Sequence, residues 1–220
     1  MIKGIIFDFD GTIMDSETPV YQAWSEIYRQ YNQFLPVELW RRIVGTTGGN
    51  FDPAKYLSDK LNNSVDIADL ELQESNLERA LLLDVAPLPG VSEYLAEASR
   101  LEIKLGISSS ASADWVTSNL KRLELMHYFE AITTQEEVQF TKPYPYLYEK
   151  TLKKLDLYPY QVIAIEDSPF GVTAAKAAGI FVVAVPNEVT RFMKLDHADM
   201  ILNSLADVTL PELITRIMAG

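Results

Sequence analysis

The opening stretch of the chain, MIKGIIFDFDGT over residues 1–12, is the part of the sequence that decides the fold. Its apolar run, residues 2–7, is short and rich in β-branched side chains, which is typical of a strand buried on both faces of a sheet. A turn at residues 10–12 follows soon after it. Because side chains two apart in an extended segment face the same way, we expect Asp8 and Asp10 to present two carboxylates to one small volume.

Beyond residue 88 the sequence alternates between two kinds of apolar stretch. Short runs predict strands at 103–108, 131–133, 162–165, 180–185 and 200–202, and stretches with helical spacing between them predict helices. This alternation favours a Rossmann-like parallel sheet with helices on both faces, an α/β fold. Sites in such sheets lie beyond the carboxyl ends of the strands, so the chemistry is expected just after each strand.

The segment between residues 16 and 87 has a different pattern. Apolar residues recur there at helical spacing around a Gly/Thr loop at 45–50, and no convincing strand occurs before Val85. The sequence Pro-Leu-Pro-Gly at 87–90 is typical of a return linker. The predicted organisation is a core domain of residues 1–15 and 88–220, with a small all-helical domain of residues 16–87 inserted after the first strand.

Composition excludes several kinds of site. The 220 residues include no cysteine and only two histidines, His127 and His197, which excludes thiolate chemistry and a multi-histidine zinc centre. A formal net charge of −12 disfavours nucleic acid as a partner, because the protein and the phosphate backbone of DNA or RNA are both negative and repel each other. No apolar run approaches the ~20 residues of a membrane span, and the first run is too short for a signal peptide. We therefore expect a cytoplasmic protein with no membrane partner.

Polar side chains follow the predicted strands at the edge where a site is expected. Ser109 and Ser110 come between a strand and a helix, where hydroxyls and free backbone N–H groups bind anions. Lys142 lies in a loop stiffened by two prolines, and a positive charge held in this way suits a phosphate. Glu166 and Asp167 follow the strand at 162–165, and carboxylates from two loops are ligands that Mg²⁺ takes.

Each of these features also has an ordinary structural explanation. Asp-Gly pairs are common in turns, serine and aspartate cap helices, and Lys142 could be a surface lysine in a proline turn. Their combination at successive strand ends of one sheet favours a shared site. Together they supply an oxygen nucleophile, a second acid/base, a cation site and a lysine, which are the parts of a phosphoryl-transfer centre.

The same residues, in the same order, resemble the motifs of the haloacid dehalogenase superfamily of phosphotransferases. The segment 8–12 resembles its first motif, Ser109 its second, Lys142 its third, and Glu166 with Asp167 its fourth. The resemblance covers essentially the whole chain. It places the helical insert where the subgroup that includes β-phosphoglucomutase and phosphoglycolate phosphatase carries a small cap domain.

The resemblance implies a mechanism and a set of site residues. Asp8 would attack phosphorus and form an aspartyl-phosphate, and Asp10 would protonate the leaving group and then activate water. Mg²⁺, or alternatively Mn²⁺, would be held by the Asp8 side chain, the Asp10 main-chain carbonyl and Asp167, with Glu166 assisting. The implied phosphate-binding residues are Thr12, Ser109, Ser110 and Lys142.

Departures from the mutase pattern favour hydrolysis. Val20 is found where β-phosphoglucomutases carry a histidine on the first cap helix, and the loop at 43–50 lacks their lysine and arginine. A mutase must hold a bisphosphate, which requires cationic groups on the cap, so water is the favoured acceptor. The prediction is a monomeric, Mg²⁺-dependent phosphomonoester hydrolase for a small phosphorylated metabolite such as a sugar phosphate. A phosphosugar mutase and a non-catalytic binding protein are the alternatives.

Substrate specificity is assigned by the resemblance to the cap face above Asp8. The candidates are Glu17, Tyr21, Thr46, Thr47 and Asn50. Plain helix or loop surface is the alternative for each of them, and for Tyr21 the alternative is packing inside the cap.

Overall fold

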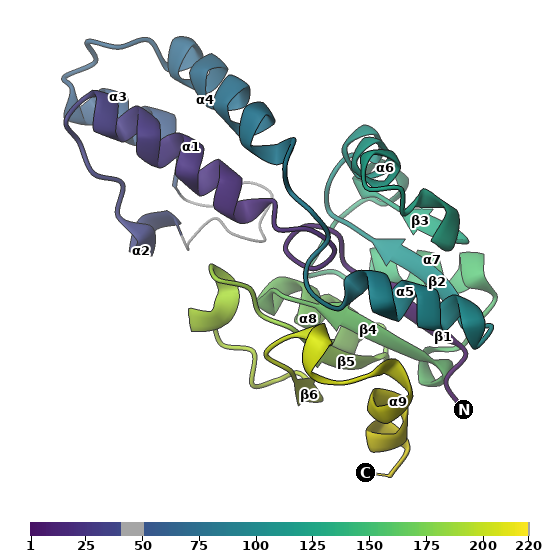
Figure 1. Cartoon of the computed structure of the whole chain (residues 1–220). Coiled ribbons are helices and arrows are strands. Elements are labelled where there is room, and N and C mark those ends of the chain that lie inside the picture. Colours follow the sequence, from purple (N-terminus) through teal and green to yellow (C-terminus); the bar gives the residue numbers. More distant parts are fainter. Residues whose placement is uncertain (41–50, 220) are drawn as a thin grey trace. The chain divides into compact units, whose positions relative to one another are not determined.

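The computed structural model describes residues 1–40 and 51–219 of the chain. The chain forms two compact units, Met1–Met14 with Ala86–Gly220 and Asp15–Val85 (Figure 1). The units divide after residues 14 and 85, close to the predicted domain boundaries after 15 and 87. The larger unit contains the sheet, and the smaller unit is made of helices.

The larger unit is built on six parallel strands, hydrogen-bonded in the order β3-β2-β1-β4-β5-β6. The strands are β1 (Gly4–Phe7), β2 (Lys104–Ser108), β3 (Ala131–Thr133), β4 (Val162–Glu166), β5 (Phe181–Ala184) and β6 (Met200–Ile201). Every residue of β1 is buried, as expected for a central strand covered on both faces. This sheet confirms the predicted α/β fold class.

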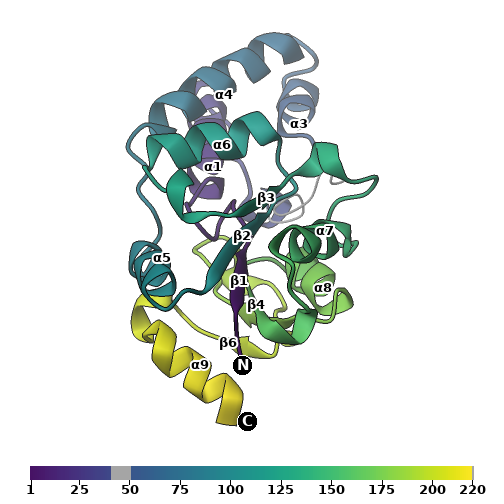
Figure 2. The same ribbon diagram turned by 90° about the vertical axis from the view of Figure 1, so that its right-hand side faces the viewer.

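Helices cover both faces of the sheet (Figure 2). They are α5 (Val91–Arg100), α6 (Ala113–Arg122), α7 (Tyr146–Leu155), α8 (Pro169–Ala177) and α9 (Leu210–Ala219), with 3₁₀ turns η1 (Met126–Tyr128), η2 (Gln135–Glu137), η3 (Pro159–Gln161), η4 (Thr190–Phe192) and η5 (Leu205–Asp207). One face is covered by α7, which packs on β1 to β3, and by α8, which packs on β4 and β5. On the other face, α5 packs on β2 and on α9.

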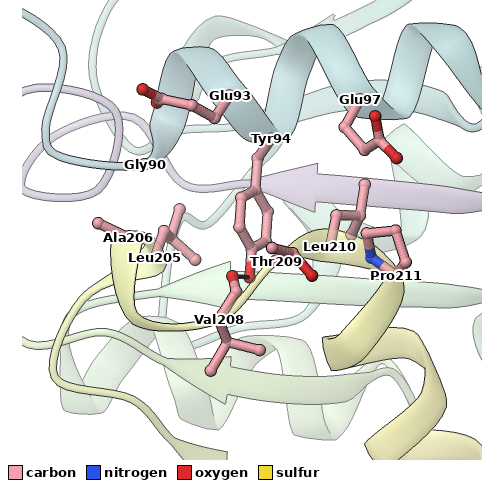
Figure 3. A pocket seen from close by; sticks show the side chains of 10 residues that line it. All are labelled: Gly90, Glu93, Tyr94, Glu97, Leu205, Ala206, Val208, Thr209, Leu210 and Pro211. Carbon is pink, nitrogen blue, oxygen red and sulfur yellow. Dashed lines mark hydrogen bonds between the residues drawn. The ribbon is translucent and has the colours of Figure 1, made fainter.

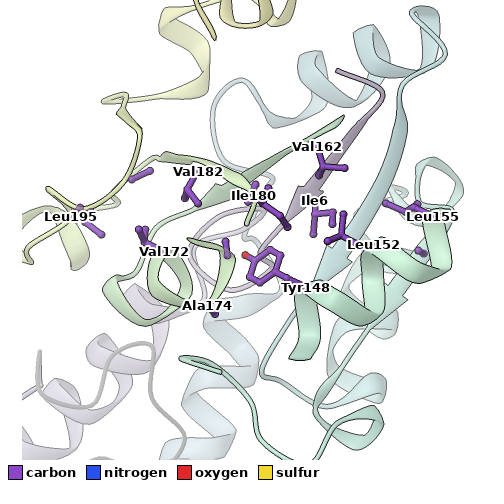
Figure 4. Close-up of a cluster of buried hydrophobic side chains, with 14 residues drawn as sticks. Ile6, Tyr148, Leu152, Leu155, Val162, Val172, Ala174, Ile180, Val182 and Leu195 are labelled. Carbon is purple, nitrogen blue, oxygen red and sulfur yellow. The ribbon is translucent and has the colours of Figure 1, made fainter. Parts of the chain in front are cut away.

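A hydrophobic core fills the space between the sheet and helices α7 and α8 (Figure 4). Its largest members are Ile6, Tyr148, Leu152, Leu155, Val162, Val172, Ile180, Val182 and Leu195. Each aliphatic side chain that leaves water in this way contributes about 1.5–3 kcal/mol to stability. The core therefore fixes α7 and α8 firmly against the strands whose carboxyl ends carry the polar residues.

The C-terminal helix α9 is absent from the predicted elements. It starts after Thr209, whose N–H and hydroxyl both donate to Glu212 Oε2 at 3.1 and 2.8 Å, and Pro211 lies in its first turn. Thr-Leu-Pro-Glu is a helix-start signature, so the signal was present in the sequence. Beside α9, the Tyr94 hydroxyl donates to the carbonyl of Val208 at 2.7 Å (Figure 3).

A cavity of about 500 Å³ lies next to α5 and α9, and Tyr94 and Val208 are among the residues that line it (Figure 3). Its lining mixes apolar side chains of the C-terminal segment, such as Leu205 and Leu210, with the carboxylates of Glu93 and Glu97 on α5. None of the predicted site residues lines it.

The smaller unit contains α1 (Glu17–Gln30), α2 (Val37–Trp40), α3 (Pro53–Lys60) and α4 (Ile67–Leu82). No strand occurs among its described residues, 15–40 and 51–85, as predicted. Asp52 and Asp66 accept backbone N–H groups at the starts of α3 and α4, which is why these helices begin there. The Tyr28 hydroxyl donates to the carbonyl of Pro53 at 2.7 Å and ties α1 to α3. Among the helices of the described residues, none has the length and hydropathy that crossing a membrane requires.

Candidate active site

The parallel register brings the ends of the central strands to one edge. Phe7 at the end of β1 is paired with Ile107 on β2 and Ile165 on β4. The Asp8 N–H donates to the carbonyl of Ile165 at 2.9 Å, so Asp8 continues the ladder by one residue. The loops that follow β1, β2 and β4 therefore start side by side.

The turn after Asp10 depends on a glycine. Gly11 has φ of +80°, a conformation that side chains with a Cβ rarely adopt. A Cβ at this position would also lie 2.3 Å from Asp167 Oδ2. The N–H of Gly11 donates to the carbonyl of Met14 at 2.8 Å, which closes the turn. Glycine is thus required here both for the backbone angle and for the close approach of the β4 loop.

Lys142 lies at the centre of the site. Its buried ammonium contacts Asp8 Oδ1 and donates to Glu166 Oε1 at 2.6 Å. The Tyr148 hydroxyl donates to the same Glu166 oxygen at 2.5 Å, and the Tyr148 ring centroid lies 5.4 Å from the ammonium. The loop containing Lys142 and the first turn of α7 thus reach the loops after β1 and β4.

Burial and charge shift the pKa values of these groups in a consistent way. Burial raises the pKa of the Asp8 carboxyl to about 7, Lys142 opposes this rise, and Glu166 adds to it. Burial alone would lower the pKa of Lys142, but the carboxylates of Asp8 and Glu166 together raise it above its usual range. The pKa of Tyr148 is raised well above its usual value, chiefly by burial and then by Glu166, so its phenol stays protonated and donates. The carboxylates of Asp8 and Glu166 thus favour the charged form of Lys142 beside Asp8.

The acidic residues of the site have the chemistry of a hard-cation site. Carboxylate oxygens of Asp8, Glu166 and Asp167 lie within 4.8 Å of one another, and all three residues are buried. Three buried carboxylates repel one another, and the single ammonium of Lys142 offsets only part of that charge. An all-oxygen set of this kind suits Mg²⁺ or Mn²⁺. The residues present therefore fit the implied metal.

Asn187 joins two parts of the site and is missing from the predicted residues. Its side-chain amide donates to Asp167 Oδ2 at 2.8 Å and to the carbonyl of Gly11 at 3.2 Å. The amide oxygen accepts the N–H groups of Val189 and Thr190, both at 2.9 Å, which sets its orientation. Asn187 lies three residues after β5, so applying the strand-end rule to that strand as well would have found it.

Asp10 also has a partner that sequence reasoning missed. The indole Nε1 of Trp115 donates to Asp10 Oδ1 at 2.8 Å. Trp115 lies in the first turn of α6, 105 positions away along the chain. No short-range pattern connects the two residues, so only the folded chain reveals this contact.

Hydroxyl groups lie on the loops after β1 and β2. Ser109 is buried, and its Oγ accepts the N–H of Ala111 at 3.0 Å. The buried Oγ1 of Thr12 and Oγ of Ser110 have no hydrogen-bond partner within the described part of the chain. Buried hydroxyls are normally hydrogen-bonded, so these two have unused capacity to donate to an anion.

The structure thus brings Asp8, Lys142, Glu166 and Asp167 together. Asp10, Thr12, Ser109 and Ser110 lie on the loops of the same strand edge. Glu17 lies in the first turn of α1, in the helical unit, and its role remains a prediction. Tyr21 packs inside that unit, since its ring centroid lies 5.7 Å from that of Trp40 and its hydroxyl donates to the Leu35 carbonyl at 3.3 Å. Thr46, Thr47 and Asn50 lie outside the described residues.

The chain is similar to known proteins along most of its length. A family model described as haloacid dehalogenase-like hydrolase matches residues 5–185. YhcW of Bacillus subtilis (strain 168), named provisionally as a phosphatase, is 37% identical over 99% of this chain and 98% of its own length. The phosphorylated carbohydrates phosphatase of Thermotoga maritima is 30% identical over 81% of this chain and 82% of its own length. The crystal structure of CbbY from Rhodobacter sphaeroides in complex with phosphate has a TM-score of 0.73 and 29% identity, covering 97% of this chain and 100% of that one.

Proposed function

Because the chain belongs to the haloacid dehalogenase-like hydrolases, in the subgroup of phosphatases and β-phosphoglucomutases, we propose that it hydrolyses a small phosphorylated metabolite. The proposed reaction passes through an aspartyl-phosphate on Asp8, with Mg²⁺ bound. The chain is a phosphoric monoester hydrolase, and the name of its relative from Thermotoga maritima supports phosphorylated carbohydrates as the substrate class. The observation that carries the mechanism is the buried cluster in which Lys142 contacts Asp8 and Glu166.

In the first half of the reaction, an Asp8 oxygen attacks the phosphorus of the substrate. The bond between phosphorus and the leaving oxygen breaks, and Asp10 gives its proton to that oxygen, so a neutral alcohol departs. Lys142 and the hydroxyls of Thr12, Ser109 and Ser110 hold the phosphoryl oxygens and offset their charge. The product is Asp8 carrying a phosphoryl group, with Asp10 ionised.

In the second half, Asp10 takes a proton from a water molecule whose oxygen attacks the same phosphorus. The bond between Asp8 and phosphorus breaks, and inorganic phosphate leaves. Asp8 returns to the carboxylate and Asp10 to the protonated acid, so the balance of atoms and protons closes. One residue serves as acid and then as base because its protonation state after the first half is the one needed for the second.

The metal would be held by the side chains of Asp8 and Asp167 and by the main-chain carbonyl of Asp10, with Glu166 beside them. When bound, Mg²⁺ supplies positive charge that lowers the repulsion between a carboxylate nucleophile and an anionic phosphoryl group. Mn²⁺ fits the same oxygen donors.

The experiment is to measure phosphate release from a panel of phosphorylated metabolites, with Mg²⁺ and with a chelator. The panel should contain p-nitrophenyl phosphate, β-glucose 1-phosphate and phosphoglycolate. We expect release that requires Mg²⁺ and is fastest with a sugar phosphate. Conversion of β-glucose 1-phosphate to the 6-phosphate without phosphate release would instead identify a mutase. Equal release with and without metal would contradict the proposed metal dependence.

A further inference from the structure

The contact between Trp115 and Asp10 joins two loops of the site that are far apart in sequence. Asp10 lies in the turn after β1, and Trp115 lies beyond the serines that follow β2. The indole Nε1 lies 2.8 Å from Asp10 Oδ1, a normal distance for an N–H to oxygen hydrogen bond. Neither capping of helix α6 nor packing in the core requires the Trp115 indole N–H to point at a carboxylate. The contact therefore calls for an explanation.

The backbone of Trp115 is held in place at the start of α6. The backbone N–H of Trp115 donates to the helix-capping Ser112 Oγ at 3.3 Å, and the Asn119 side chain donates to the Trp115 carbonyl at 3.1 Å. Val116 and Leu120 are fully buried and anchor the helix to the larger unit. Trp115 is therefore a donor on a rigid element, and rigid elements hold functional groups more accurately than loops do.

Asp10 itself lies in the turn that follows β1. The turn is closed by a bridge between Asp10 and Met14 and by the hydrogen bond from Gly11 to the same residue. An acid/base must reach first the leaving oxygen and then the water, and a misplacement of ~1 Å can cost roughly 100-fold in rate. The proposed reaction therefore requires the folded protein to hold the Asp10 carboxylate in a defined position.

We propose that Trp115 is a positioning residue that holds the Asp10 carboxylate in the orientation used for both proton transfers. The inference rests on the proposed function, since it gives Asp10 the acid/base role. An indole N–H donates but has no lone pair with which to accept, so Trp115 does not itself relay the proton. Its effect on the reaction passes entirely through Asp10.

The first test asks whether the contact exists in solution, without using activity. The chain has three tryptophans, so a proton–nitrogen correlation spectrum should contain three indole N–H signals. Trp115→Phe identifies the Trp115 signal by its loss. If that variant does not fold, Trp24→Phe and Trp40→Phe identify it by elimination. We expect Asp10→Ala to shift the Trp115 signal more than the other two. An unchanged Trp115 signal would overturn the inference.

The second test asks whether the contact orients Asp10 during turnover. Trp115→Phe keeps an aromatic ring and removes the N–H, so we expect kcat to fall by roughly 10- to 100-fold, with KM within about twofold. The matched control is Lys121→Ala, an exposed position on the same helix, which should leave kcat unchanged. In an Asp10→Asn background, Trp115→Phe should cause no further loss, because the group that it positions is no longer an acid.

The outcomes separate this inference from the proposed function. Absence of Mg²⁺-dependent phosphate release by the wild-type enzyme would contradict the proposed function, whatever the spectra show. Wild-type activity with unchanged kcat in Trp115→Phe would overturn the positioning role alone. A loss that persists in the Asp10→Asn background would mean that Trp115 acts through packing. An increase in kcat would mean that the bond restrains Asp10 in an unproductive orientation, which also overturns the inference.

Discussion

At the scale of the single residue, burial of Asp8 favours its neutral carboxylic acid, whereas its proposed role as nucleophile requires the carboxylate. Burial raises the pKa of its carboxyl to about 7, although a nucleophile must be ionised. The neighbouring Lys142 ammonium keeps this rise from being larger, and its own pKa is held above the usual range by Asp8 and Glu166. A divalent cation among the three carboxylates would favour the ionised form further. A bound cation would therefore help Asp8 to reach the ionised form that attack on phosphorus requires.

Asp8→Asn should abolish turnover and preserve the fold. An amide cannot form the aspartyl-phosphate, and losses on removing a nucleophile are large, so we expect kcat to fall by at least about 10⁴-fold. The fold should persist because Lys142 keeps its 2.6 Å bond to Glu166. Phosphate release gives the rate, and circular dichroism with a thermal melt gives the fold. Turnover within tenfold of wild type would remove Asp8 as the nucleophile.

At the scale of the element, α8 begins directly against the site. Pro169 occupies its first turn, and the Ser168 Oγ accepts the N–H of Gly171 at 3.1 Å. A Cβ on Gly171 would lie 1.9–2.1 Å from the carboxyl group of Glu166, closer than any real contact. The positive end of the helix dipole thus approaches Glu166 only because position 171 has no side chain.

Gly171→Ala should impair the site although alanine is the better helix former. Helix propensity favours alanine by about 1 kcal/mol, but the methyl group must displace the Glu166 carboxylate. We expect kcat to fall by at least roughly tenfold and the Mg²⁺ concentration for half-maximal rate to rise. Both are read from phosphate release against Mg²⁺ concentration.

The matched control for this variant is Gly179→Ala, just beyond the other end of α8. Gly179 has φ of +78°, and a Cβ there would meet nothing closer than 3.5 Å. This change should lower thermal stability through backbone strain without altering the Mg²⁺ requirement. If the two variants changed the Mg²⁺ requirement equally, the contact with Glu166 would not be the cause.

For the whole molecule, charge and folding are linked through the metal site. The chain carries a formal net charge of −12, and the site itself gathers three buried carboxylates around one lysine. A bound cation that removes the repulsion between these carboxylates should favour the folded state, because the carboxylates come together only when the chain is folded. A ligand that binds only the folded protein stabilises it by mass action.

Mg²⁺ should therefore raise the unfolding midpoint of the enzyme. At a concentration 100 times its dissociation constant, the gain is about 2.7 kcal/mol. Thermal melts over a Mg²⁺ series, with a chelator as the zero point, measure it without any substrate. Asp167→Asn serves as the control and should show a smaller rise. Identical midpoints in chelator and in saturating Mg²⁺ would speak against a metal site in this cluster.

Local patterns in the sequence determined much of this protein. Short apolar runs and helical spacing predicted the strands and most helices, because side-chain period follows directly from backbone geometry. The residues after those strands predicted Asp8, Asp10, Lys142, Glu166 and Asp167 as one group, since parallel strands place their carboxyl ends together. The helix α9 could have been found in the same way from its start signature.

Only the tertiary structure decided which side chains support that group. The strand order, and the hydrogen bonds of Trp115, Tyr148 and Asn187, depend on how helices and loops pack against the sheet. Trp115 lies 105 positions from Asp10, and Asn187 lies 176 positions from Gly11. A periodic pattern reports on neighbours within a few residues, whereas a hydrogen bond across such a separation forms only when the whole core is assembled.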